Sequence, residues 1–246
     1  MLRNRTASGF SLVEISIVLV IVSLLMAGLL PTLSGQVEQH HASDTRKQLD
    51  DIRQALIGFA LTYGRLPCPA DGSIPTGQSG AGLEVTTGSG SSMTCANAGG
   101  VLPWATLGVN ETDGWGRRYT YRVDSYFADA ISANTYGSGC APTTLPTQSS
   151  FALCSTGRLD VLSASSGGTT IAGNVPAVVV SHGSNGFGAY TPAGQQIPGA
   201  SGDEAENADD DNTFVSHDMT PSFDDQVIWI SPAILFNRMV AAGKLP

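Results

Sequence analysis

Residues 9–35 read GFSLVEISIVLVIVSLLMAGLLPTLSG, an almost unbroken apolar run that holds one carboxylate, Glu14. Residues 10–30 contain fourteen Leu, Ile, Val and Phe residues, and residues 15–37 carry no charged side chain. That length suffices to cross a hydrocarbon core of about 30 Å. The apolar residues contribute on the order of −6 kcal/mol to insertion, against at most about +3 kcal/mol for one acid at mid-membrane. We therefore predict a transmembrane helix over residues 10–36.

The basic residues around this run predict its orientation. Arg3 and Arg5 precede it, and no Lys or Arg follows before Arg46. By the positive-inside rule the N-terminus lies in the cytoplasm and everything after Leu30 is exported. A cleavable secretory signal peptide is the alternative. Its apolar core is usually only about 7–15 residues long and ends at a small-residue cleavage site, of which Met26-Ala27-Gly28 is only a weak version.

The string Gly9-Phe10-Ser11-Leu12-Val13-Glu14 stands between a short basic leader and a long apolar helix. It resembles the processing site of type IV pilins and of the pseudopilins of type II secretion systems. In that family a prepilin peptidase cuts after the Gly on the cytoplasmic side and methylates the new N-terminal residue. The resemblance implies that residues 1–9 are a cytoplasmic leader peptide, that cleavage follows Gly9, and that Phe10 becomes N-methylated.

The same resemblance implies an assembly role for Glu14, which would neutralise the new terminal amine of its own chain or of a neighbouring subunit. Phe10 and Glu14 lie four positions apart, so they share one face of a helix. Moving an amine and a carboxylate from water into low-dielectric surroundings costs less free energy when the two groups are paired than when each is alone. The alternative is an isolated acid that extends to the membrane interface.

The helix is predicted to continue beyond the membrane. The family commonly has a Pro at the position of Pro31, which favours a kinked continuous helix over a helix end. Over residues 37–64 an amphipathic stripe follows with spacings of three and four, which predicts a helical segment that packs on a folded head. Gly64 supplies the helix end. The stripe consists of Leu49, Ile52, Leu56, Phe59 and Tyr63.

The remaining residues, 65–246, are predicted to form an exported globular head domain. Short apolar or alternating runs bounded by Gly, Ser or Asp indicate strands of an antiparallel sheet. Ser231-Pro232 is a good helix start, and a helical run follows to residue 242. The predicted fold class is therefore α+β and pilin-like, with a long N-terminal helix packed on an antiparallel sheet. The predicted strands are residues 117–124, 159–162, 177–181 and 226–230.

Four cysteines fall in the head, which an oxidising compartment would convert to two disulfides. A zinc site would need closer ligand spacing. Three pairings are possible. We favour the pairing of neighbours, Cys68 with Cys95 and Cys140 with Cys154, each closing a long loop.

The charge distribution is uneven. The net charge is −9, and between Arg158 and Arg238 there are ten Asp and Glu residues but no Lys or Arg. Nucleic acid is therefore not an expected partner, because phosphate binding needs a basic face. Clustered carboxylates suit Ca²⁺, and the resemblance adds that major pseudopilins bind Ca²⁺ in a loop late in the head. The predicted ligands are Asp203, Glu204, Glu206, Asp209 and Asp211; the alternative is a solvated acidic loop, since Phe214 stands where an EF-hand needs Gly.

Catalysis receives little support. Ser181 and His182 are adjacent, so they would point to opposite sides of a strand, and no G-x-S-x-G motif is present. We predict that the protein is not an enzyme and has no catalytic residues, although a secreted hydrolase is kept as a less favoured alternative.

The predicted function is that of a pilin-like structural subunit in the bacterial inner membrane with a periplasmic head. Its expected partners are the prepilin peptidase, the membrane, and other pilin or pseudopilin subunits that pack through the N-terminal helix. The large head favours a minor pilin or minor pseudopilin. The filament could be a type IV pilus, a type II secretion pseudopilus or a DNA-uptake filament, and a tethered periplasmic binding module that never polymerises is a further alternative.

Overall fold

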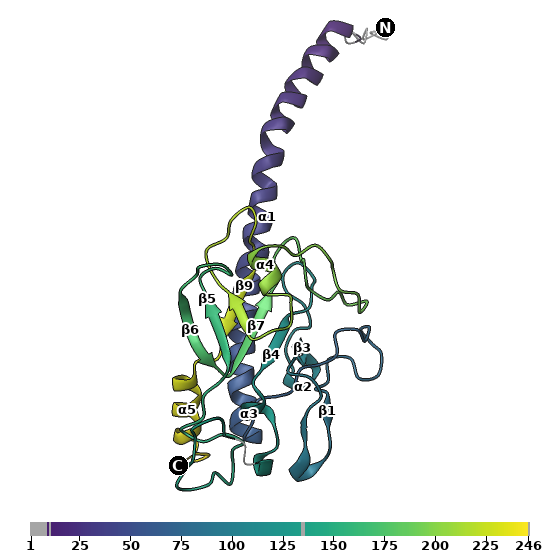
Figure 1. The fold of residues 1–246 in the computed structure, drawn as a ribbon. Coiled ribbons are helices and arrows are strands. Elements are labelled where there is room, and N and C mark those ends of the chain that lie inside the picture. The colour runs from purple at the N-terminus through teal and green to yellow at the C-terminus, as the bar shows by residue number, and fades with distance from the viewer. Residues whose placement is uncertain (1–8, 10, 134–135, 246) are drawn as a thin grey trace. The chain divides into compact units, whose positions relative to one another are not determined.

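A computed structural model describes residue 9, residues 11–133 and residues 136–245, with only the backbone for residues 26–34 and 133. The predicted long helix is present as α1 (Leu12–Tyr63), which continues through Pro31 without a break. The chain divides into two compact units, residues 1–40 and 41–246, so α1 contributes to both. In Figure 1 the helices and strands are labelled, and the colour follows the chain from the N-terminus to the C-terminus.

The centre of the second unit is a four-stranded sheet in which every neighbouring pair is antiparallel. Tyr121 pairs with Val179, and Val179 pairs in turn with Ile228. Three of its strands coincide with predicted ones. In spatial order the strands are β3 (Gly99–Val101), β4 (Thr120–Val123), β7 (Ala177–Ser181) and β9 (Gln226–Trp229).

The second half of α1 packs on one face of this sheet. Leu49, Ile52 and Leu56 are almost fully buried and share one core cluster with residues of the sheet, among them Tyr121 and Val179. The predicted amphipathic stripe is therefore confirmed over these turns. Its last member, Tyr63, is the last residue of α1 and is 58% exposed. Helix α5 (Pro232–Ala241) adds Leu235 and Met239 to the same core, and begins at the predicted Ser231-Pro232 start.

A second, three-stranded sheet was not predicted. The predicted α+β class with antiparallel pairing is confirmed for the four-stranded sheet. The predicted strand 159–162 lies instead in this second sheet, whose pair β5 and β8 is parallel. All five residues of β7 are buried, and Val178 and Val180 share an apolar cluster with β5. A strand that is buried on both faces reads as a continuous apolar run. The strands of this sheet are β6 (Thr170–Val175), β5 (Leu159–Leu162) and β8 (Thr213–Val215).

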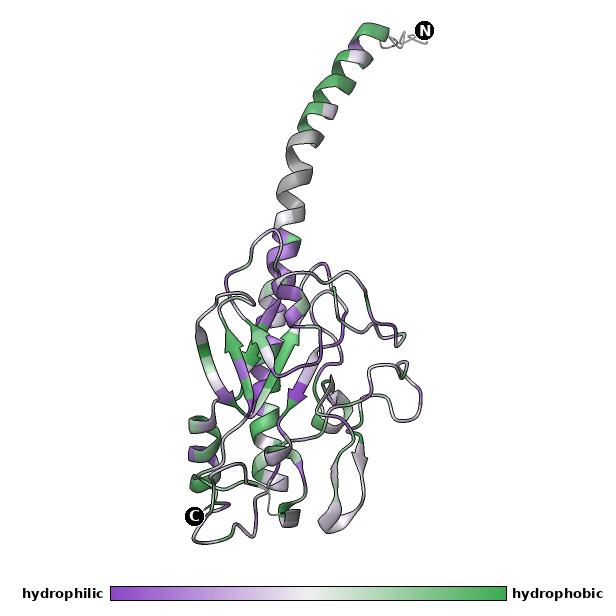
Figure 2. Ribbon diagram, viewed as in Figure 1, coloured by the Kyte–Doolittle hydropathy of each residue, from purple (hydrophilic) through white to green (hydrophobic). Residues whose placement is uncertain are grey.

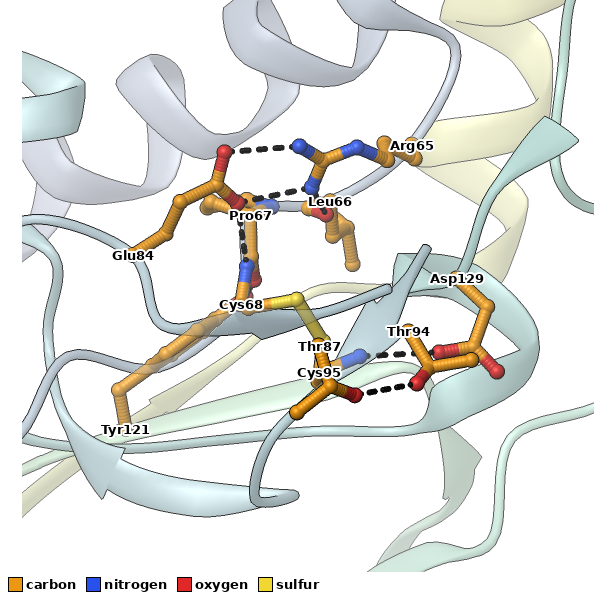
Figure 3. The surroundings of a disulfide bond; sticks show 10 residues. All are labelled: Arg65, Leu66, Pro67, Cys68, Glu84, Thr87, Thr94, Cys95, Tyr121 and Asp129. Carbon is orange, nitrogen blue, oxygen red and sulfur yellow. Dashed lines mark hydrogen bonds and ion pairs between the residues drawn. A yellow bond between two sulfur atoms is a disulfide. The ribbon is translucent and has the colours of Figure 1, made fainter. Parts of the chain in front are cut away.

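Long loops and short elements complete the head, and both favoured disulfide pairings are confirmed. Cys68 bonds to Cys95 and Cys140 bonds to Cys154. Figure 3 shows the first disulfide beside the ion pair of Arg65. The short elements are β1 (Thr86–Thr87), η1 (Gly90–Ser92), β2 (Thr94–Cys95), α2 (Trp104–Leu107), α3 (Ser125–Ala128), η2 (Ile131–Ala133) and α4 (Asp203–Glu206).

Candidate functional site

The predicted processing region lies at the start of α1. Gly9 is exposed, and among the described residues no atom lies within 4 Å of a Cβ placed at this position. Glu14 is exposed in the first turn of the helix. Phe10 and residues 1–8 of the predicted leader lie outside the described residues. The predicted pairing of Glu14 with the amine of Phe10 therefore stays a prediction.

The first turns of α1 expose an apolar surface. The large apolar side chains between Leu12 and Leu25 are each at least 41% exposed, and Figure 2 shows this segment as strongly hydrophobic. The hydroxyls of Ser16 and Ser23 donate to carbonyls of their own helix, at Val13 and Leu19, so they need no partner outside it. Contiguous apolar surface on this scale calls for a covering layer, either lipid or other protein.

No helix in the described part of the chain is both long enough and apolar enough to cross a membrane. The predicted span over residues 10–36 includes Phe10 and the side chains of residues 26–34, which lie outside that part.

The predicted calcium ligands do not converge as one group. Asp203 accepts hydrogen bonds from the hydroxyl and the N–H of Ser165, at 2.6 and 2.8 Å, and lies 3.1 Å from Nε2 of His217. These hydrogen bonds, the one from the Ser165 hydroxyl first, hold the pKa of Asp203 below its ordinary value. Asp209 and Asp211 instead accept from backbone N–H groups two residues ahead, as turn residues do.

One predicted ligand, Glu204, meets two acids that the predicted set left out. Among the described residues, Glu204, Asp224 and Asp225 each offer a carboxylate oxygen within 4.8 Å of the others. We refer to these three residues as the carboxylate cluster. Its members come from α4 and from the segment leading into β9. Asp224 and Asp225 stand next to each other in the sequence, but only the fold brings them to Glu204.

Hydrogen bonds fix the orientation of the cluster. Oδ2 of Asp224 accepts from the hydroxyl and the N–H of Ser184 and from the N–H of Asn185. Oε1 of Glu204 accepts from the side-chain amide of Asn185 at 2.8 Å. Oδ2 of Asp225 accepts from the side-chain amide of Asn207 at 2.8 Å.

Burial shapes the electrostatics around Asp225. Burial, reinforced by the charges of Glu204 and Asp224, raises the pKa of Asp225 to about 8. Burial lowers the pKa of His182 to about 4, although the charge of Asp224 opposes the shift. The imidazole of His182 is therefore neutral at pH 7, and its Nε2 lies 2.8 Å from the Thr120 hydroxyl.

The serine and histidine considered for hydrolysis have different partners. Ser181 donates to Oδ2 of Asp113 at 2.7 Å, whereas His182 pairs with Thr120. Ser181 is the last residue of β7, and adjacent strand residues point to opposite faces. The absence of enzymatic activity stays a prediction.

Comparison with known proteins adds one finding at the processing region. Residues 4–30 match the family model described as the prokaryotic N-terminal methylation motif. No curated protein and no solved structure shows significant similarity to the chain. The matched segment contains Gly9, Phe10 and Glu14 and the first turns of the exposed apolar helix. The chain thus carries the hallmark of the prepilin-type signal of type IV pilins and pseudopilins.

Proposed function

We propose that the chain is the precursor of a pilin-like structural subunit, of the minor pilin or minor pseudopilin kind, which assembles into a type IV pilus or a type II secretion pseudopilus. The observation that carries this proposal is a methylation motif placed directly on a helix with an exposed apolar surface. The two features belong together, because a processed N-terminus on such a helix can enter an apolar assembly.

Before assembly, the apolar part of α1 lies in the inner membrane with Gly9 on the cytoplasmic side. Arg3 and Arg5 before the apolar run support this orientation. The head is then periplasmic. Its two disulfides support an oxidising compartment, since disulfides are rare in the cytosol.

After cleavage, the equivalent helices of neighbouring subunits replace lipid around α1. Because lipid tails are as apolar as these side chains, van der Waals packing between the helices drives this exchange, and not removal of surface from water. Glu14 neutralises the amine of Phe10, of its own chain or of the adjacent subunit, and so fixes the register of packing.

Mass spectrometry of the full-length protein purified from its membrane tests the proposal. We expect the mature chain to begin at Phe10 and to carry one methyl group on its amine. Gly9→Val should leave the leader attached, whereas Gly35→Val, a matched change at an exposed glycine outside the processing site, should not. A native chain that begins at any other residue contradicts the proposal.

A further inference from the structure

The central sheet has two edge strands, and the fold caps only one of them. At β3, the backbone of Ala70 exchanges two hydrogen bonds with that of Val101 and so closes this edge at the end of the strand. At β9, which forms the other edge, no strand or isolated bridge of the described residues pairs with the outer side. An open edge presents unpaired N–H and C=O groups to any extended chain.

The register of the sheet shows which groups of β9 lie on this open side. The N–H of Ile230 donates to the carbonyl of Ala177, so these two residues form a hydrogen-bonded pair of the ladder. Along an antiparallel ladder such pairs alternate with pairs that share no hydrogen bond. Val227 and Trp229 fall at the alternate positions, so their N–H and C=O groups point away from β7. Strand β9 therefore offers two donors and two acceptors on its open side.

Strand β9 also lacks the features that usually protect an edge. Natural edge strands carry charged residues, Pro or bulges that prevent further pairing. At β6, an edge of the second sheet, the register is irregular and Asp160 accepts a hydrogen bond from the N–H of Asn174. The four residues of β9, QVIW, include no charge and no Pro, and their register with β7 is regular. The strand is therefore suited to gain a neighbour.

A cavity of about 310 Å³ lies between β9 and α1. Its walls include apolar side chains from both elements, Ile228 of β9 and Leu49 of α1, and Met219 from the loop before β9. The volume is within the range of ligand sites, about 300–1,000 Å³. A chain that pairs with β9 directs alternate side chains to the two faces of the sheet. Those on the side of α1 would have this cavity to fill.

Arg46 supplies the unpaired charge on the α1 wall of the cavity. It forms no ion pair with an acid of the described residues, whereas Asp50 on the same wall is paired with Arg53. Of the other acids in the lining, Asp225 is buried and Asp218 belongs to the loop. An acidic side chain that entered along α1 would therefore find a partner in Arg46.

We propose that β9 binds an extended segment of a partner protein as an additional strand, with an apolar side chain in the cavity and an acidic side chain at Arg46. Strand addition draws its affinity from main-chain hydrogen bonds and its specificity from pockets for alternate side chains. Val227 and Trp229 supply the hydrogen-bonding groups, and the cavity supplies the pocket. This interaction is separate from assembly through the N-terminal helix, because all of its residues lie in the second compact unit.

Calorimetry of the full-length protein in detergent tests the proposal with short synthetic peptides. The first alternates Val and Thr around a central Glu, and the second has Lys in place of Glu. Two further forms of the first peptide are N-methylated, one at its Val residues and one at its Thr residues. We expect the Glu peptide to bind with one site per chain and the Lys peptide to bind more weakly. One N-methylated form should bind about tenfold more weakly or worse, because one edge of the peptide pairs with β9.

Variants of the protein locate the binding site. Val227→Pro should abolish binding of the Glu peptide but keep the ladder with β7, since Pro is tolerated where the N–H faces away from the sheet. Arg46→Glu, a change at an exposed residue, should reverse the preference between the Glu and Lys peptides. Lys47→Glu makes the same charge change at the next residue, which is exposed and does not line the cavity, and should leave the preference unchanged.

Three results would overturn the proposal. The first is a wild-type protein that binds neither the Glu peptide nor the Lys peptide, a measurement that does not depend on whether any variant folds. The second is peptide binding that both Val227→Pro and Arg46→Glu leave unchanged. The third is self-association of the full-length protein that Val227→Pro abolishes, which would assign the open edge to a second copy of this chain.

Discussion

Arg65 and Glu84 form a two-pronged ion pair next to the disulfide of Cys68. Two guanidinium nitrogens of Arg65 donate to the two oxygens of Glu84, at 2.8 and 2.7 Å, and Oε2 also accepts from the N–H of Cys68 (Figure 3). Both charged side chains are mostly buried, at 12% and 20% exposed. The pair thus anchors the end of α1 to the loop that carries Glu84.

Glu84→Gln should lower the free energy of unfolding by about 1–3 kcal/mol, because it removes charge-assisted hydrogen bonds from a mostly buried group. Burial by itself would raise the pKa of Glu84, but the hydrogen bonds from Arg65 and Cys68 outweigh it and hold the pKa below its ordinary value of 4.5. The stabilisation is therefore present above about pH 4.5 and is lost as the pH falls through the lowered pKa.

Denaturant unfolding of both proteins as a function of pH measures this effect. The wild type and Glu84→Gln should converge in acid and differ at pH 7. Asp50→Asn serves as the control, because the pair of Asp50 with Arg53 is exposed and contributes little. A constant difference between the two proteins at all pH values would rule out the ionic explanation.

The two disulfides should contribute unequally to the free energy of unfolding of the head. In the chain-entropy model, the 27-residue separation of Cys68 and Cys95 gives about 3.5 kcal/mol, and the 14-residue separation of Cys140 and Cys154 gives about 3 kcal/mol. Replacement of both Cys68 and Cys95 by Ala should therefore lower the free energy of unfolding at least as much as replacement of both Cys140 and Cys154. Denaturant midpoints of the two variants check the order, and a larger loss at Cys140 and Cys154 would contradict it.

Gly58 lies inside α1 and Gly64 directly follows it, so substitution of the two glycines by Ala makes a matched comparison. Gly64→Ala should destabilise the head by at least about 1–2 kcal/mol, because φ is +72° and a Cβ would collide with the carbonyl oxygen of Gln148. Gly58→Ala should instead stabilise it by about 1 kcal/mol, since Gly58 lies inside the helix with nothing within 4 Å of a Cβ. Melting temperatures that shift in the same direction for both variants would refute this account.

Glu14→Ala should abolish filament assembly but leave the amount of mature protein in the membrane unchanged, because the loss affects packing between subunits and not the folding of the head. Counting filaments by electron microscopy, beside quantification of the mature protein, checks this expectation. Ser16→Ala is the control, since the Ser16 hydroxyl donates to the carbonyl of Val13 in its own helix. Normal function without Glu14 would instead favour a tethered binding module that never polymerises.

The elements that were predicted correctly are those whose signal is local. The stripe through Leu49, Ile52 and Leu56 repeats every helical turn, and the Ser231-Pro232 start depends on two adjacent residues. Residues 177–180 are all apolar because β7 is buried on both faces, which made the run recognisable as a strand.

The second sheet and the carboxylate cluster escaped prediction because they depend on long-range pairing. Strand β6 is mostly exposed and includes Gly173 and Asn174, so it shows no alternation. The parallel pairing of β5 with β8 joins segments about fifty residues apart, and the sequence of neither segment signals this pairing. Likewise, Glu204 was singled out for the density of acids around it, yet its neighbours in space are Asp224 and Asp225.

Because α1 supplies one wall of the head's core, the compact unit that contains the head starts inside the helix, at His41, and not after it. A shortened form that begins at His41 keeps Leu49, Ile52 and Leu56. One that begins at residue 65 would leave a face of the central sheet open to water. Cleavage within the last turns of the helix would therefore expose this face of the sheet and unfold the head, as well as separate it from the first turns of α1.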